Sequence, residues 1–199
     1  MTDVEMKDAS AKENKKDEKK PEEEPEVHDP FFDFKRVLVL LEKGAKDKDY
    51  KLCAALTKKF KKLRKDLSIS DVMLLFEFFL PELHRRVAFT HKSTQVENRA
   101  EKLHVTEDRA RIIMELPETQ LFLYNLVLMK LIDAADFKNA KDFGDFIYAR
   151  IKDVNLRTMD HLGAKSMYFI GVVYEKLEML PQVRPMMMDA YKSCCLKLD

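Results

Sequence analysis

The chain has 199 residues, and its 36 Lys or Arg almost balance its 35 Asp or Glu, giving a formal net charge of +1. This balance argues against a general nucleic-acid-binding protein, which would carry a clear basic excess. Four Gly and seven Pro are too few for the turns of an all-β protein or an α/β nucleotide-binding protein. The composition therefore favours an all-α fold.

The three cysteines and the apolar runs indicate the compartment. No apolar segment near the N-terminus is typical of a secretory signal, so the Cys residues are not expected to form a disulfide scaffold. No apolar run approaches the roughly 18 residues needed to cross a bilayer. We therefore expect a soluble, intracellular protein with no membrane interaction.

Residues 1–29 differ in composition from the rest of the chain. They hold six Lys against eleven Asp or Glu, a net charge of −5, and no aromatic residue, whereas the remainder has a net charge of +6. So few apolar side chains cannot offset the entropy of ordering the backbone. We predict a disordered, charged N-terminal tail. We interpret its run Lys15–Lys20 as solvated tail rather than as a nuclear-import signal.

Residues 30–92 are predicted to form N-terminal helical hairpins. The first helix has the i, i+3, i+7 spacing of a buried stripe, at Phe31, Phe34, Leu38 and Leu41. Gly44 is predicted to end this helix, and Asp49 to cap the next one.

The second helix is predicted as one continuous element. Its apolar face comprises Leu52, Cys53, Leu56, Phe60, Leu63 and Leu67. Ser70 or Asp71 is predicted to begin a third, very apolar helix. Pro81 either ends that helix or begins a new turn as its first residue.

Residues 93–116 are predicted to form a charged linker that contains at most one exposed helix. Apolar residues are thinly spaced here. Residues 117–199 are predicted to form two tetratricopeptide-like helix pairs. Pro117 begins the first helix, and a short turn at Ala135–Asp136 precedes its partner. Thr158 or Asp160 is predicted to begin the next helix, and Pro181 the last.

A repeated pattern relates the predicted helix pairs. A shift of 43 residues aligns Phe137 with Leu180, Ala140 with Val183 and Phe143 with Met186. A shift of 87 residues aligns Tyr50 with Phe137, Cys53 with Ala140 and Leu56 with Phe143. Within the last pair, the tetratricopeptide spacing of small and large residues falls at Gly171, Tyr174, Val183 and Ala190.

The physical reason for such a pattern is steric. Two antiparallel helices approach closely only where small side chains face each other, and a bulky side chain then fills the next gap. The pattern predicts a tetratricopeptide-like α-solenoid of antiparallel helix pairs, which is stabilised by neighbouring repeats and presents a curved binding surface.

No motif predicts catalysis, so we expect no enzyme, no cofactor, no metal ion and no small-molecule substrate. Cys194 and Cys195 are adjacent, and on a helix their side chains point about 100° apart, which suits a metal site poorly. None of the five His forms a His-x-x-x-His pair, and the four isolated Gly form no phosphate loop. A Cys nucleophile would need a positioned His, for which there is no signature.

Two clusters leave alternatives open. Six basic residues fall between Lys58 and Lys65, either as a phosphate-binding stripe or as the solvated side of an amphipathic helix. We favour the solvated side, so nucleic acid is an improbable partner. Met186–Met188 is interpreted as core filling between helices in preference to a flexible contact surface.

The sequence of residues 116–199 resembles a known family. LPETQLFLYNLVLMKLIDAADFKNAKDF and AKSMYFIGVVYEKLEMLPQVRPMMMDAY are similar to the family of non-ATPase regulatory subunit 3 of the 26S proteasome lid. FKRVLVLLEKGAKDKDYKLCAAL and LLFEFFLPEL, upstream, resemble its N-terminal helices. The carrying motifs are Leu116-Pro117-Glu118, Ala164-Lys165 before Tyr168, and Val173-Tyr174-Glu175.

The resemblance implies a non-catalytic scaffold subunit in ubiquitin-dependent protein degradation, in the cytoplasm and nucleus. It implies other lid subunits as partners, contacted by the helical arm. The family ends in a winged-helix (PCI) domain that these 199 residues do not contain, so we interpret the chain as an N-terminal portion or a truncated form. Scaffold subunits of the signalosome and of translation-initiation complexes share this plan and remain the alternative. We also expect the isolated chain to self-associate through its last helix.

Overall fold

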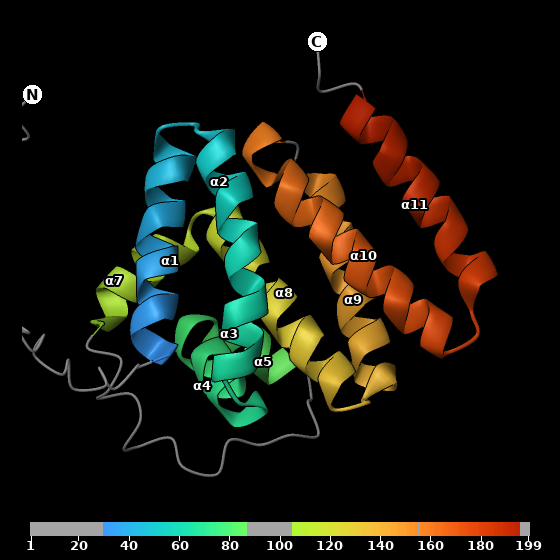
Figure 1. Ribbon diagram of the computed structural model, residues 1–199, viewed down its shortest axis with the longest axis horizontal. Coiled ribbons are helices and arrows are strands. Elements are labelled where there is room, and N and C mark those ends of the chain that lie inside the picture. The colour runs from blue at the N-terminus through green and yellow to red at the C-terminus, as the bar shows by residue number, and fades with distance from the viewer. Residues whose placement is uncertain (1–29, 87–104, 155, 196–199) are drawn as a thin grey trace, which may run out of the picture.

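The computed structural model describes residues 30–86, 105–154 and 156–195, all of whose regular elements are helices (Figure 1). The N-terminal part comprises α1 (Pro30–Lys46), α2 (Tyr50–Leu56), the 3₁₀-helix η1 (Thr57–Lys59), α3 (Phe60–Asp66), α4 (Ile69–Phe79) and α5 (Pro81–Arg86). The remainder comprises α7 (Glu107–Met114), α8 (Pro117–Asp133), α9 (Phe137–Asp153), the 3₁₀-helix η2 (Arg157–Met159), α10 (Asp160–Lys176) and α11 (Leu180–Cys195). The predicted all-α solenoid is confirmed; the tail predicted as disordered, residues 1–29, lies outside the described residues.

Three antiparallel helix pairs form the stack: α1 with α2, α8 with α9, and α10 with α11 (Figure 1). Helix α8 lies in the middle, where α1, α4, α9 and α10 all pack against it. Helix α11 lies at the edge and packs on α10. The stack therefore has a thoroughly enclosed interior helix and an open outer one.

The same turn joins the two helices of each pair. Lys48, Ala135 and Glu178 have left-handed φ angles of 54°, 56° and 58°. The following amide donates to the carbonyl five residues earlier: Asp49 N to Gly44 O at 2.8 Å, Asp136 N to Leu131 O at 3.0 Å, and Met179 N to Tyr174 O at 2.8 Å. With a second bond from each left-handed residue, this is the Schellman motif. The three turns are 87 and 43 residues apart, the intervals that align the helix pairs in the sequence.

The prediction that Gly44 ends the first helix is wrong. The helix continues to Lys46, and Lys48 supplies the left-handed residue. Gly44 instead allows α1 and α2 to approach, because a Cβ there would lie 3.0 Å from Cys53 Sγ. The glycine is thus explained by helix packing rather than by a turn.

The predicted second helix is interrupted. Its apolar face does point inward, with Cys53, Leu56, Phe60, Leu63 and Leu67 buried and Leu52 partly buried. Between α2 and α3, however, the backbone tightens into η1, where Thr57 Oγ1 donates to Ala54 O at 2.7 Å. A hydroxyl bonded back to the preceding turn competes with regular helix geometry.

Capping residues explain where the other helices begin. Asp49 caps α2 as predicted, accepting from the amides of Lys51 and Leu52. Helix α4 is capped by Ser68 and not by Ser70 or Asp71, since Ser68 and Asp71 form a capping box. Pro81 and Pro117 begin α5 and α8 as their first residues.

The C-terminal helices begin close to the predicted positions. Asp136 caps α9, directly after the left-handed Ala135. Helix α10 begins at Asp160, one of the two predicted residues, and Thr158 lies in the preceding η2. Helix α11 begins at Leu180, one residue before the predicted Pro181.

Helix α7, in the predicted linker, is less exposed than expected. Thr106 caps it, and Ala110, Ile113 and Met114 are buried against its neighbours. Arg109 Nη2 donates to Glu42 Oε2 of α1 at 2.5 Å. Helix α7 has four charged and four apolar residues, so the sequence conceals a short but well-anchored amphipathic helix.

Candidate interaction surfaces

The predicted repeat positions are spread along the stack, where they pair helices. Tyr50, Phe137 and Leu180 are the first residues of α2, α9 and α11 and are all partly or largely solvent-exposed. Cys53, Ala140 and Val183 follow three residues later and are buried. Leu56 and Phe143 are buried as well, whereas Met186 is half-buried.

The remaining repeat positions lie between the last helices. A Cβ on Gly171 would lie 2.6 Å from Met187 Cε, so the glycine admits the Met187 side chain beside α10. Tyr174 is buried and its hydroxyl donates to Asp145 Oδ1 at 2.6 Å, which links α10 to α9. Ala190 is half-buried. The structure therefore brings these residues together in helix contacts and not in one ligand site.

Helix α11 presents a second apolar face to solvent. Val183 is 2% exposed and packs inward, while Leu180, Met188 and Tyr191 are 51%, 49% and 67% exposed. The prediction that the methionine run fills the space between helices is met in part: Met186 is half-buried and Met187, although 38% exposed, places its tip beside Gly171, whereas Met188 is 49% exposed. A helix apolar on two faces is typical of one packed between two neighbours. This open face is a candidate docking surface.

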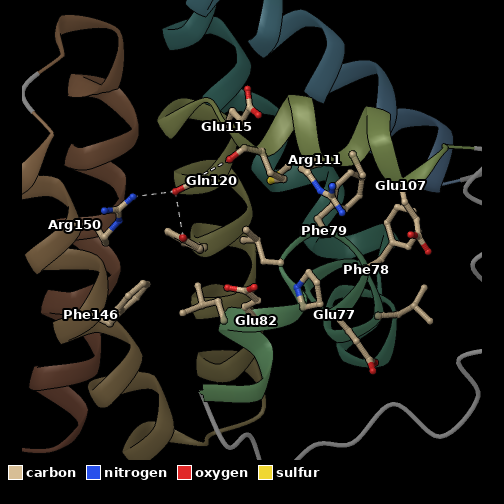
Figure 2. A pocket seen from close by; sticks show the side chains of 17 residues that line it. Glu77, Phe78, Phe79, Glu82, Glu107, Arg111, Glu115, Gln120, Phe146 and Arg150 are labelled. Carbon is tan, nitrogen blue, oxygen red and sulfur yellow. Dashed lines mark hydrogen bonds between the residues drawn. The ribbon is translucent and has the colours of Figure 1, made fainter.

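A groove of about 1130 Å³ lies between α4, α5, α7, α8 and α9 (Figure 2). Its walls include Phe78, Phe79, Leu83, Met114 and Phe146. Sequence analysis missed it because its residues come from five helices, and no local pattern indicates their proximity.

The polar groups of this groove are held in a fixed arrangement. Arg150 Nη2 and the Tyr124 hydroxyl donate to Gln120 Oε1 at 3.3 and 3.4 Å, and Gln120 Nε2 donates to the Met114 carbonyl at 2.6 Å (Figure 2). Burial raises the pKa of Tyr124, so its hydroxyl stays protonated at neutral pH. The rim carries Glu77, Glu82, Glu107, Glu115, Arg111 and Arg150. Apolar walls with a charged rim suit protein contact.

The basic run from Lys58 to Lys65 lies on the side of η1 and α3 opposite the buried Phe60 and Leu63. This is the solvated side of the helix that the sequence predicts. Lys62 Nζ pairs with Asp33 Oδ2 of α1 at 2.6 Å, and Arg64 pairs with Asp133 of α8 through two nitrogens. Two members of the run therefore hold helices together.

The cysteines show no reactive environment in the part of the chain that the structure describes. Cys53 is fully buried, and burial, with the nearby Glu118 and Asp49 charges, raises the pKa of its thiol to about 11. It is therefore a poor nucleophile at neutral pH. The side chains of Cys194 and Cys195 lie outside the described residues. Within the described ranges, no three His, Cys, Asp or Glu side chains gather as metal ligands, and no helix is long and apolar enough to span a bilayer.

Known proteins share this sequence pattern. A family model described as PSMD3-like, N-terminal TPR repeats, matches residues 27–199. A probable 26S proteasome non-ATPase regulatory subunit 3 from Nicotiana tabacum is 26% identical over 172 residues, covering 85% of this chain and 35% of the relative. The probable subunit from Drosophila melanogaster is 28% identical over 160 residues, covering 80% of this chain and 32% of the relative.

A third relative extends the similarity within plants. The 26S proteasome non-ATPase regulatory subunit 3 homolog B from Arabidopsis thaliana is 26% identical over 172 residues, covering 84% of this chain and 35% of the relative. The chain thus spans about a third of the length of the curated relatives it matches.

Proposed function

Because the chain belongs to the family of PSMD3-like N-terminal TPR repeats, we propose that it is a non-catalytic scaffold subunit of the 26S proteasome regulatory particle lid. In this role it serves ubiquitin-dependent protein degradation by protein–protein contacts of its helical arm. Three relatives that are named as regulatory subunit 3 support the assignment. A protein of such an assembly works in the cytoplasm and nucleus and requires no cofactor.

The observation that carries the proposal is the open face of α11. Leu180, Met188 and Tyr191 are about half or more exposed although they lie on a helix whose other side is packed. Single exposed apolar residues are ordinary, but several on the outer side of one helix are typical of a protein interface. We propose other lid subunits as the partners of this face, and neither small molecules nor nucleic acid.

The predicted division of the chain fits this role and remains a proposal. Residues 30–92 form a first group of hairpins, 93–116 a connection, and 117–199 the pairs that end in α11. Residues 1–29 form a charged tail outside the arm. The helix pairs before α10 then mainly stabilise the stack, and the last pair, α10 with α11, carries the docking face.

The test is capture of purified lid subunits by the full chain. We expect wild type to retain at least one lid subunit. The double variant Met188→Glu/Tyr191→Glu should lower the retained amount at least about tenfold, because two charges would be buried without partners. The matched control Phe32→Glu/Val39→Glu changes exposed apolar residues on α1 and should bind as wild type does.

Two outcomes would contradict the proposal. A folded chain that captures no lid subunit would refute it. Capture of signalosome or translation-initiation subunits in place of lid subunits would assign the chain to one of those related assemblies instead.

A further inference from the structure

The groove between α4, α5, α7, α8 and α9 combines apolar walls with an acidic rim. Its volume is about 1130 Å³, and none of its lining residues belongs to α10 or α11. We infer that this groove binds a basic amphipathic helix of a partner protein. The inference goes beyond the proposed function, because it concerns a second surface whose occupation does not require the docking face of α11.

The size and the walls of the groove suit the apolar face of a helix. Helix α5 packs mainly on α4, and the groove lies between α5 and the helices α7 and α9. Phe79 and Met114 in its walls are buried, whereas Phe78, Leu83 and Phe146 are partly exposed. Pockets for small molecules occupy about 300–1,000 Å³, so this groove is larger than they are. Apolar side chains spaced at i, i+3, i+4 and i+7 on a docked helix would fill it.

The interior of the groove favours a helix over an extended segment. Its walls are helices, which bond their backbone groups internally and offer no sheet edge to an extended strand. The polar side chains inside are also paired with one another, since Gln120 Oε1 accepts from Arg150 and Tyr124 and Gln120 Nε2 donates to the Met114 carbonyl. A docked helix satisfies its own backbone groups and needs only apolar contact here. Polar recognition therefore falls to the rim.

The rim is complementary in charge to a basic partner. Its charged residues are four carboxylates and two guanidinium groups, namely Glu77, Glu82, Glu107, Glu115, Arg111 and Arg150. The rim thus has a formal net charge of −2, whereas the whole chain has a net charge of +1. A positively charged helix is attracted to such a rim, and an acidic segment or a nucleic acid is repelled by it.

Three of the rim carboxylates are available to a partner. Glu82, Glu107 and Glu115 are exposed, and none of these carboxylates forms a hydrogen bond or an ion pair within the described ranges. Glu82 belongs to α5 on one side of the groove, and the other two belong to α7 on the other side (Figure 2). Lys or Arg residues on both flanks of a docked helix would therefore each meet a carboxylate.

Binding of a designed peptide to the full chain tests the inference. The probe is a fluorescein-labelled peptide of about 15 residues with Leu and Phe on one helical face and Lys on both flanks of that face. It should bind at least about tenfold more tightly than the same peptide with Glu in place of Lys, and than a shuffled peptide of the same composition. Its helix content by circular dichroism should rise on binding, because so short a helix is only marginally stable alone. Equal affinity for the three peptides, or binding without a gain of helix, would overturn the inference.

Charge-reversal variants of the chain test the role of the rim. Glu82→Lys/Glu115→Lys should weaken binding of the Lys peptide at least about tenfold and should make the Glu peptide the tighter ligand. The matched control Asp66→Lys/Glu175→Lys adds the same charge at exposed positions of α3 and α10 and should bind as wild type does. Equal weakening in the control would overturn the inference.

Photocrosslinking locates the bound peptide. With benzoylphenylalanine in place of one Phe of the probe, links should fall on groove residues such as Leu83, Met114 and Phe146. Links confined to α11, or loss of binding in Met188→Glu/Tyr191→Glu, would place the peptide on the other docking face and overturn the inference. A dimer of the chain that the peptide dissociates in sedimentation would make a second copy the occupant, which would also overturn it.

Discussion

Helices α8 and α11 are of similar length, yet their surroundings differ completely. Every residue of α8 from 121 to 131 is buried, including the polar Asn125 and Lys130. In α11, Val183 is buried while Leu180 and Tyr191 are mostly exposed. Helix α8 has neighbours on all sides, and α11 packs on α10.

The difference shows that position in the stack decides how much of a helix of this kind is enclosed by its neighbours. Phe122 of α8 stacks on Phe60 of α3 with ring centroids 4.4 Å apart, which joins the second helix pair to the first. Helix α11 makes fewer contacts with its neighbours. One of them joins it to α9: the Asp189 carboxylate lies 3.4 Å from the Tyr148 hydroxyl and 3.8 Å from Lys152 Nζ. The interior helix stabilises the arm, and the edge helix offers a surface.

The largest expected effect is loss of the Phe122 ring. Phe122→Ala should lower the free energy of unfolding by about 3–5 kcal/mol, because it leaves a cavity between α3 and α8. Val127→Ala in α8 and Val183→Ala in α11 remove the same two methyl groups, and the change in α8 should cost about 1–2 kcal/mol more than the change in α11. Urea denaturation followed by circular dichroism measures all three variants; equal losses for the two Val→Ala variants would contradict the distinction between interior and edge.

Helices α8 and α11 also differ in where their proline residues lie. Pro117 is the first residue of α8, where no intrahelical bond is lost, whereas Pro185 lies inside α11 and removes the bond to the Pro181 carbonyl. Pro185→Ala should therefore stabilise α11 by about 1–3 kcal/mol. The expected readout is slower amide exchange confined to α11. Pro117→Ala is the control and should change the stability by less than about 0.5 kcal/mol.

A cluster of ion pairs lies between α1 and α7, two helices that pack against α8. Glu42 is nearly buried and accepts from Lys46 and Arg109; the Lys46 hydrogen bond and both positive charges lower the pKa of its carboxyl below the usual value. A carboxyl with a lowered pKa stabilises the fold above its unfolded pKa of about 4.3 and loses this contribution as the pH falls through the folded pKa. Glu42→Gln should thus cost about 1–2 kcal/mol at pH 7.

The same variant predicts a pH dependence. The difference in stability between wild type and Glu42→Gln should shrink as the pH falls below about 4, in denaturant titrations at several pH values. A difference that stays constant down to pH 3 would show that the charge of Glu42 contributes nothing.

The smallest effects are expected at the repeated turns. Ala135 and Glu178 hold left-handed backbone that a glycine adopts without strain, so each change to Gly should stabilise its turn by up to about 1 kcal/mol. Ala135→Gly, next to α8, should raise the midpoint of global thermal unfolding. Glu178→Gly, next to α11, should mainly slow local exchange there. The reverse pattern would mean that α11 unfolds together with the interior.

Local signals made part of this fold predictable from sequence. Asp49 and Pro117 mark helix starts because capping and proline chemistry depend on a few adjacent residues. The role of Gly44 is not predictable from its neighbours in sequence, because it depends on Cys53 across the helix pair, and the left-handed Lys48 has no compositional signature.

The candidate surfaces were harder to predict. The exposure of the apolar residues on α11 depends on which helices pack against it in the described chain, and the groove between α4 and α9 is assembled from five helices. The repeat intervals of 43 and 87 residues did carry information, because the three Schellman turns recur at those intervals.

Hydrogen–deuterium exchange of the full chain tests the central claim most directly. Amides of α8 should exchange only through global unfolding, while those of α11 should exchange at least about a hundredfold faster and slow down when purified lid subunits are added. Exchange in α11 as slow as in α8, in the chain alone, would contradict the account.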